Sequence, residues 1–231
     1  MKKYELTAEF IEKWGKKLFR IKALINFGSV EAGELGGYVE KEDNLAQDGN
    51  AWVCDDAEVC GNAWVCGNAR VCGNARVCGN ARVCGNAWVC DDAEVYGNAW
   101  VYGNAEVCGN ARVYGNAEVC GNARVYGNAR VCGNARVCGN ARVCGNADYL
   151  LIGRIGSRFS FTTFFKNKDK GITVSCGCFL GTIAEFRAKV TDTHGNNKHA
   201  KMYNLAADMA ELQILGEEHF DKLNTNKSEP F

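Results

Sequence analysis

The chain has 231 residues, of which 27 are basic and 27 are acidic, so its formal net charge is zero. This balance argues against nucleic acid and anionic membranes as partners, because both attract an excess of positive charge. Hydrophobic residues make up 47% of the chain, enough to bury a core. The sequence has neither the run of about 18 apolar residues that spans a membrane nor a signal peptide. We therefore expect a cytoplasmic protein.

The first 48 residues differ from the repetitive sequence that follows, and we expect them to form a small N-terminal cap. Thr7 is suited to the N-cap position of a short helix over residues 8–14. Residues 17–24 then predict a strand. A cap is required because the end of a stacked repeat otherwise exposes unpaired strand edges.

A six-residue repeat dominates the centre of the chain. Residues 49–144 form 16 consecutive units of the pattern G-N-A-x-V-C/Y, and a seventeenth unit, 145–150, departs from it. Two units begin with Asp-Asp instead of Gly-Asn, at Asp55 and Asp91. These two units lie six repeats apart, which indicates a duplicated block of six units.

One unit predicts a short strand followed by a bend. In the segment A-x-V-C/Y the side chains alternate, so alanine and valine share one face while x and C/Y share the other. Valine favours a strand, and Gly-Asn tolerates the positive φ of a corner. A single unit has no core, but stacked units bury the same residue types against each other. The pattern therefore predicts a β-solenoid over residues 49–150, with valine and alanine inside.

The remaining residues, 151–231, predict a small α+β domain. Its expected elements are a hairpin of strands 159–166 and 171–179 around Asn167-Lys168-Asp169-Lys170, helices 182–192 and 198–215, and a frayed tail 224–231. Cys176 and Cys178 would share one face of a strand, and His194 could approach them. A Cys–His pair such as Cys178 with His194 is a weak candidate for nucleophilic catalysis, since cysteine in a strand is more often packed core.

The repeat resembles the hexapeptide repeat of left-handed parallel β-helix proteins, a family that includes many acyltransferases. In that family three units form one triangular coil. The flanks, Gly36-Gly37-Tyr38-Val39-Glu40 and Val174-Ser175-Cys176-Gly177-Cys178 among them, resemble those of bacterial and prophage members described as transferases or polymer-forming proteins. The resemblance implies a three-sided, left-handed solenoid. Acyltransferases of the family use a histidine between subunits of a trimer, whereas residues 49–150 contain no histidine.

With three units per coil, the outward x positions form three faces, and two of them place an arginine between tryptophans. We expect these ladders either to support the solenoid or to form a binding surface, because tryptophan and arginine dominate interaction hot spots. The residues of this candidate surface are Trp52, Arg70 and Trp88 on one face and Trp64, Arg82 and Trp100 on another.

A third face carries alternating charges, Glu58, Arg76, Glu94 and Arg112, which predicts a ladder of ion pairs. Arginines are concentrated near the C-terminal end of the solenoid. They are candidates for binding an anion, with an ordinary soluble surface as the alternative: Arg112, Arg124, Arg130, Arg136 and Arg142.

Twelve of the 14 cysteines occupy the C/Y position of a unit. Strands stacked about 4.8 Å apart fit poorly to disulfide geometry, and no Cys-x-x-Cys zinc motif occurs in the repeat. Tyrosine also occupies this position. We therefore expect reduced surface thiols and no dedicated metal site, with adventitious binding of a soft metal by the stacked cysteines as the alternative.

The sequence favours binding over catalysis and implies no cofactor. Together with the resemblance, it predicts a phage or prophage accessory protein in the host cytoplasm, homo-oligomeric as a dimer or trimer, that binds a host protein or sequesters a ligand, as an anti-defence protein would. The alternatives are a trimeric hexapeptide-repeat acyltransferase and a self-assembling structural protein.

Overall fold

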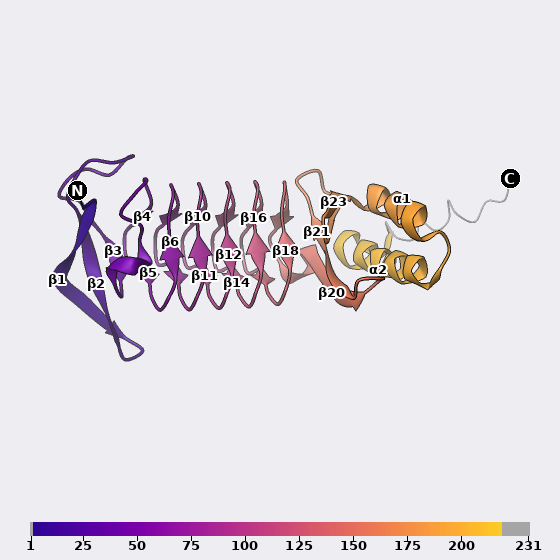
Figure 1. Ribbon diagram of the computed structural model, residues 1–231, viewed down its shortest axis with the longest axis horizontal. Helices are drawn as coiled ribbons and strands as arrows, with labels where there is room; N and C mark the ends of the chain where they lie inside the picture. The colour runs from indigo at the N-terminus through magenta and orange to yellow at the C-terminus, as the bar shows by residue number, and fades with distance from the viewer. Residues whose placement is uncertain (1, 219–231) are drawn as a thin grey trace.

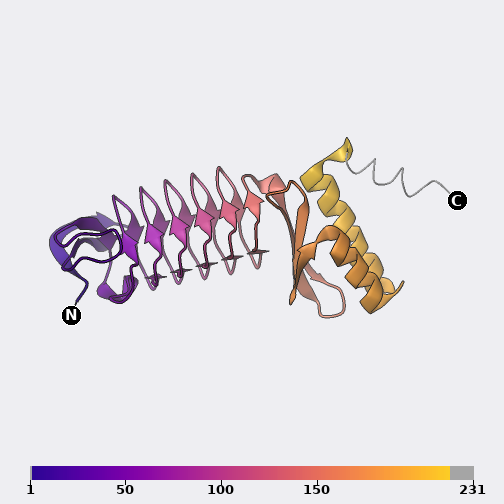
Figure 2. The ribbon, with the colours of Figure 1, turned by 90° about the horizontal axis from the view of Figure 1, so that it is seen from above.

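The computed structural model describes residues 2–218 and shows an elongated solenoid with a β-hairpin region at one end and two helices at the other (Figure 1). Figure 2 shows the coils of the solenoid stacked side by side along the long axis. The prediction of a mainly β protein with a three-sided parallel solenoid and an α+β C-terminal part is confirmed.

Three parallel sheets form the sides of the solenoid, and each coil contributes one two-residue strand to each sheet. The six-stranded sheet consists of β4 (Trp52–Val53), β7 (Arg70–Val71), β10 (Trp88–Val89), β13 (Glu106–Val107), β16 (Arg124–Val125) and β19 (Arg142–Val143). The five-stranded sheet consists of β6 (Trp64–Val65), β9 (Arg82–Val83), β12 (Trp100–Val101), β15 (Glu118–Val119) and β18 (Arg136–Val137).

The third side continues into the N-terminal region and forms an eight-stranded sheet. Its solenoid strands are β5 (Glu58–Val59), β8 (Arg76–Val77), β11 (Glu94–Val95), β14 (Arg112–Val113) and β17 (Arg130–Val131). Its other strands are β3 (Leu35–Val39), β2 (Lys16–Ala23) and β1 (Tyr4–Lys13). Only β3 is parallel to its solenoid neighbour; β1 and β2 run antiparallel.

The solenoid core is made of the repeated valines and alanines, as predicted. Every repeat valine from Val53 to Val143 and every repeat alanine from Ala51 to Ala141 is buried. Each buried valine contributes roughly 1.5–3 kcal/mol before the entropy cost of ordering the chain. The seventeenth alanine, Ala147, was expected inside but is exposed, because the chain leaves the solenoid in the 3-10 turn Asn146–Asp148.

The two residues of each corner have different roles. The repeat glycines from Gly49 to Gly139 have φ between 64° and 74°, whereas the asparagines avoid positive φ. Instead, asparagine side chains of successive coils donate to one another at 3.0–3.4 Å along two corners. The expectation that asparagine supplies positive φ is therefore wrong; its amide links one coil to the next.

The predicted helix over residues 8–14 is absent, because those residues belong to β1 and its turn. β1 and β2 form an antiparallel hairpin whose two turn residues, Trp14 and Gly15, have φ of 52° and 72°. Positive φ at both central residues matches the right-handed twist of a hairpin. The predicted strand over 17–24 is confirmed by β2. The 3-10 turn Glu42–Asn44 leads from β3 into the repeat.

Trp52 lies under this N-terminal region rather than on the surface. Its side chain is fully buried, with ring centroids 6.4 Å from Tyr4 and 5.4 Å from Phe27. A Cβ on Gly36 would come within 2.6 Å of the indole, so β3 also packs closely on it. The prediction that Trp52 belongs to an exposed binding surface is wrong, because the region before the repeat covers the first coil.

Lys3 fastens the N-terminus to the first coil and makes stability depend on pH. Its buried ammonium donates to the carbonyl oxygens of Asp48, Gly49 and Ala51 at 2.9–3.4 Å. Burial lowers the pKa of Lys3 from 10.5 to about 8, against the opposing charge of Asp48. Between these pH values the unfolded chain holds a proton that the folded chain has lost, so this lysine makes the free energy of unfolding rise with pH.

We therefore expect the stability of the wild type relative to Lys3→Met to increase from pH 8 to pH 10.5. Urea unfolding at several pH values measures the difference. The variant Lys2→Met removes the exposed neighbouring lysine that pairs with Glu42, and it is the control for a general effect of losing one positive charge at this end. A difference between wild type and Lys3→Met that is constant over this range would contradict the prediction.

The C-terminal end of the solenoid is covered by an antiparallel sheet. Its strands are β20 (Tyr149–Ile155), β21 (Ser160–Lys166), β22 (Ile172–Cys176) and β23 (Phe179–Thr182), followed by α1 (Ile183–His194) and α2 (Lys198–Leu215). The backbone N–H of Arg136 in the last coil donates to Thr163 Oγ1 at 3.0 Å. β21 therefore closes the exposed edge of the last coil.

The predicted hairpin and both predicted helices are confirmed. The tail 224–231 lies outside the described residues. No helix among residues 2–218 is long and apolar enough to cross a membrane.

Candidate functional site

The turn of the N-terminal hairpin holds an exposed tryptophan against the solenoid. Trp14 adopts φ of 52°, a region that bulky side chains rarely occupy, and 56% of it remains exposed. The guanidinium of Arg76 lies 4.2 Å from the centroid of its ring, which is cation–π geometry. Strained backbone that presents an aromatic side chain is often a functional feature.

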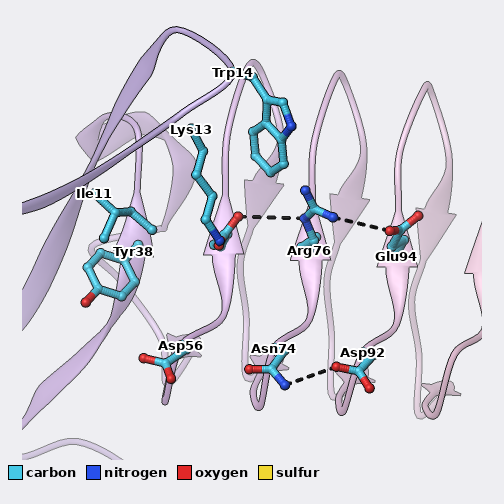
Figure 3. Close-up of a pocket in the computed structure, with 10 residues that line it drawn as sticks. Ile11, Lys13, Trp14, Tyr38, Asp56, Asn74, Arg76, Asp92 and Glu94 are labelled. Atoms are coloured by element: carbon cyan, nitrogen blue, oxygen red, sulfur yellow. Dashed lines mark hydrogen bonds and ion pairs between the residues drawn. The ribbon is translucent and has the colours of Figure 1, made fainter.

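A groove runs between the end of this hairpin and the solenoid strands β5, β8 and β11 (Figure 3). Its cavity has a volume of about 710 Å³, with Trp14 on one side and Asp56, Asn74 and Asp92 on the other. A second cavity of about 480 Å³ lies beside it and shares Trp14 and Arg76. The second cavity is more apolar, and its other lining residues include Lys16, Cys60, Cys78 and Tyr96.

The floor of the groove is the predicted ladder of ion pairs. Lys13 contacts Glu58, and Arg76 lies between Glu58 and Glu94 at 3.7 and 3.4 Å. Arg112 continues the series, 3.2 Å from Glu94. Glu58 is 3% exposed, and its Oε2 accepts no hydrogen bond from residues 2–218. The cation beside this oxygen is Arg76, whose Nε lies 3.7 Å from it.

A row of oxygen-bearing side chains forms the outer rim. Asn74 donates to Asp92 at 3.0 Å, while Asp56 is 4.0 Å from its nearest cation, Arg20. The residues that line the larger cavity include four carboxylates and only two cationic side chains, Lys13 and Arg76. The groove is therefore acidic overall and combines carboxylates with an aromatic ring.

This groove was missed from the sequence. The expected helix over residues 8–14 ended at Trp14 and hid the two-residue turn, although strand-like segments flank Trp14-Gly15 on both sides. Recognising a hairpin there would have indicated an exposed tryptophan. Its position over Arg76, which is distant in the chain, follows only from the folded structure.

The predicted tryptophan surface is divided between two sheets. Trp64 and Trp100 are exposed on the five-stranded sheet and line a cavity of about 220 Å³ with Arg82, whose guanidinium lies 5.3 Å from the Trp100 ring. Trp88 and Arg70 are exposed neighbours on the six-stranded sheet. Since Trp52 is buried, Arg70 has only one exposed tryptophan beside it.

The arginines near the C-terminal end are spread over all three sheets. Three of them pair with acids: Arg112 with Glu94, Arg124 with Glu106 at 3.0 Å, and Arg136 with Glu118 at 3.4 Å. Arg130 and Arg142 have no carboxylate within 4.0 Å among residues 2–218, but they lie on different sheets. Anion binding by these five residues stays a prediction, and the ion pairs argue against it.

The repeat cysteines are less exposed than expected, and one pair is joined. Cys60, Cys120 and Cys138 are buried, and most of the others are partly buried. Cys54 and Cys72 form a disulfide with Cα atoms 4.7 Å apart, so the expectation of reduced thiols throughout the repeat is wrong for this pair. Two adjacent coils bring the α-carbons within disulfide range.

Two groups of side chains near the stacked cysteines Cys54, Cys72, Cys90 and Cys108 could hold a metal ion. They are Cys54, Asp55 and Cys72, and their counterparts six units later, Cys90, Asp91 and Cys108; the ligand atoms of each group lie within 4.8 Å of one another. Burial raises the pKa of Cys90 and of Cys108 above the ordinary value, so both are protonated thiols near neutral pH.

The cysteines of the C-terminal part do not share one strand. Cys176 ends β22, and Cys178 lies exposed in the turn that follows. Cys176, rather than Cys178, lines a cavity of about 110 Å³ with His194 and Tyr203. Burial and the nearby Cys176 raise the pKa of Tyr203 to about 12. The weak catalytic pair Cys178–His194 is therefore not assembled in this cavity.

Comparison with known proteins supports the repeat architecture. The family model named YdcK beta solenoid repeat matches residues 69–84, 75–91, 105–121 and 117–133. All four segments lie within the solenoid and together cover less than half of the chain. No curated protein is a significant match. The similarity thus concerns a β-solenoid repeat and extends neither to a transferase activity nor to a prophage origin.

Proposed function

We propose that the protein acts by binding rather than catalysis, and that the groove beneath Trp14 holds an extended basic segment of a partner protein. The observation that carries the proposal is the lining of the cavity, in which four carboxylates face only two cationic side chains beside the exposed Trp14 ring. A cationic N–H group from a ligand would balance this excess of negative charge and form charge-assisted hydrogen bonds with the exposed carboxylates.

The rest of the groove suits the same ligand. A lysine or arginine side chain on the partner can donate to Asp56 or Asp92 on the rim, and a second cationic side chain can lie near the Trp14 ring on the opposite side. An adjacent apolar side chain can enter the second cavity beside Tyr96. The solenoid coils are closely hydrogen-bonded, so the site is preformed and binding orders little of the protein.

The wider biological role rests on resemblance. The flanks resemble those of bacterial and prophage repeat proteins, and on that basis we propose a host protein as the partner and an accessory, anti-defence role. A homo-oligomer is part of the same proposal. Acyl transfer and end-to-end self-assembly are less well supported, since the solenoid has no histidine and both of its ends are covered.

The groove is tested with an array of short peptides of basic, neutral and acidic composition. We expect basic peptides to be selected and their affinity to fall about tenfold or more in Trp14→Ala and in Asp92→Asn, because hot-spot substitutions commonly cost above roughly 1 kcal/mol. Fluorescence polarisation with the selected peptides measures the change.

The matched control is Trp88→Ala, which removes a similarly exposed tryptophan from another sheet. It should bind the selected peptides as the wild type does. Equal weakening in Trp88→Ala, or selection that ignores peptide charge, would refute the groove as the binding site. Circular dichroism of each variant confirms that the solenoid is retained.

A further inference from the structure

The two Cys–Asp–Cys groups are unusual within the repeat. Cysteine pairs stacked on successive coils also occur at Cys60/Cys78, Cys66/Cys84 and Cys120/Cys138, and glycine follows the first cysteine in each. Aspartate follows the first cysteine only at Cys54 and Cys90, which occupy the same position in the two copies of the six-unit block. The chain therefore offers the same thiol geometry with and without a neighbouring carboxylate.

The aspartates occupy a backbone position that favours glycine. Asp55 and Asp91 have φ of 56° and 58°, where the other units have glycine at 64–74°. Asp tolerates this region better than most side chains but still less readily than glycine. An intrinsic preference of the corner therefore does not explain why aspartate stands here twice.

Each carboxylate is held against the thiols by the next coil. Asp91 Oδ2 accepts a hydrogen bond from the Gly109 N–H at 2.9 Å, and Asp55 Oδ2 accepts one from the Gly73 N–H at 2.9 Å. Carboxylates that bind metals are commonly oriented in this way by a second hydrogen bond. The carboxylate and two thiols then lie within 4.8 Å of one another.

We propose that Cys90, Asp91 and Cys108 form a zinc site, and that Cys54, Asp55 and Cys72 form its twin when their disulfide is reduced. Zinc is bound tetrahedrally by thiolate, imidazole and carboxylate ligands, and here two thiolates and a carboxylate would leave the fourth position to water. Zn–S bonds of about 2.3 Å place two sulfurs about 3.8 Å apart, within reach of the present spacing. Each thiol gives its proton to solvent as its sulfur binds the ion.

The pattern could not be recognised as a linear motif, because the two cysteines of each site are three repeat units apart and only the first of them is followed by acidic residues. The coil length brings them together. The proposed ligands follow strands of the six-stranded sheet, at the corner where the neighbouring Asp56 and Asp92 form the rim of the groove. Cobalt binding is measured without a peptide, so its outcome does not depend on the proposed function of the groove.

Cobalt(II) titration of the fully reduced protein tests the proposal, since thiolate ligands give cobalt intense charge-transfer absorption. We expect two equivalents per chain, displaced by zinc. In the double variant Asp55→Gly and Asp91→Gly the affinity should fall by at least roughly 10–100-fold, because that range applies to an outer-shell partner and these variants remove a ligand itself. These variants restore the repeat consensus, so they should keep the fold, as thermal unfolding would verify.

Three further variants distinguish a metal site that needs the aspartate from unspecific binding of cobalt to any stacked pair of cysteines. Cys84→Ser disrupts a cysteine pair that lacks aspartate and should leave the titration unchanged, whereas Cys108→Ser should remove one equivalent. Gly67→Asp places a carboxylate beside Cys66 and Cys84 and should add a third equivalent. The proposal is overturned if the double glycine variant binds cobalt like the wild type, or if Cys84→Ser weakens binding as much as Cys108→Ser.

Discussion

Replacing Trp52 with alanine is expected to lower the free energy of unfolding by about 3–5 kcal/mol, the usual effect of removing a large buried aromatic side chain. Trp52 is fully buried and contacts Tyr4 and Phe27 edge-on, so its loss leaves a cavity between the N-terminal strands and the first coil. Urea unfolding followed by circular dichroism measures the change.

The matched control is Trp88→Ala. Trp88 occupies the same position of the duplicated block and the same sheet, but 47% of it is exposed. We expect this substitution to change stability by less than about 0.5 kcal/mol, as exposed substitutions usually do. Similar losses in both variants would show that the N-terminal region does not cover Trp52 in solution.

Replacing Phe165 with alanine is expected to destabilise the protein by about 3–5 kcal/mol and to open the C-terminal end of the solenoid. Phe165 is fully buried and belongs to the same core as the repeat valines, although it comes from β21. Without it the last coil loses its cover, and its strand edges become available to other chains. Hydrogen exchange should show faster exchange in the coils of β16–β19, and light scattering should show association.

Phe164→Ala is the companion variant, because Phe164 is equally buried but points to the other side of β21. Its core contains Phe186 and Tyr203 from the two helices, with ring centroids of Phe164 and Phe186 5.7 Å apart. We expect a similar loss of stability with faster exchange in α1 and α2 rather than in the coils. If both variants loosen the same region, the two cores are not separate as the structure indicates.

The solenoid could be predicted because each six-residue unit by itself specifies which side chains point inward and where the chain turns. The inward alternation of alanine and valine and the three-unit coil recur without interruption, and the corner glycine is replaced only at Asp55 and Asp91, so a single unit describes almost all of the core. The ladder of Glu58, Arg76 and Glu94 could be predicted from the same spacing, because residues 18 apart lie on neighbouring coils of one sheet. In the C-terminal part, the hairpin and both helices could be predicted because their local patterns agree with their packing.

Errors arose where a residue's surroundings come from outside its own unit. Trp52 and Trp88 are equivalent in the repeat, yet a preceding segment covers only the first. Residues 8–14 have local helical features, but pairing of β1 with β2 decides their conformation. The two-residue turn at Trp14-Gly15 then creates the groove, which no motif in either segment indicates.

The sequence by itself determined the period, the inward residues and hence the parallel solenoid, because these depend on contacts between identical units at a constant spacing. Only the tertiary structure decided which outward residues are buried, which lie over the groove and which cysteines meet aspartates. Those outcomes depend on contacts between segments that share no pattern, such as Trp14 with Arg76, or on the register of neighbouring coils, as for Cys90 with Cys108. The zero net charge of the chain likewise conceals an acidic groove that exists only once the hairpin folds over the solenoid.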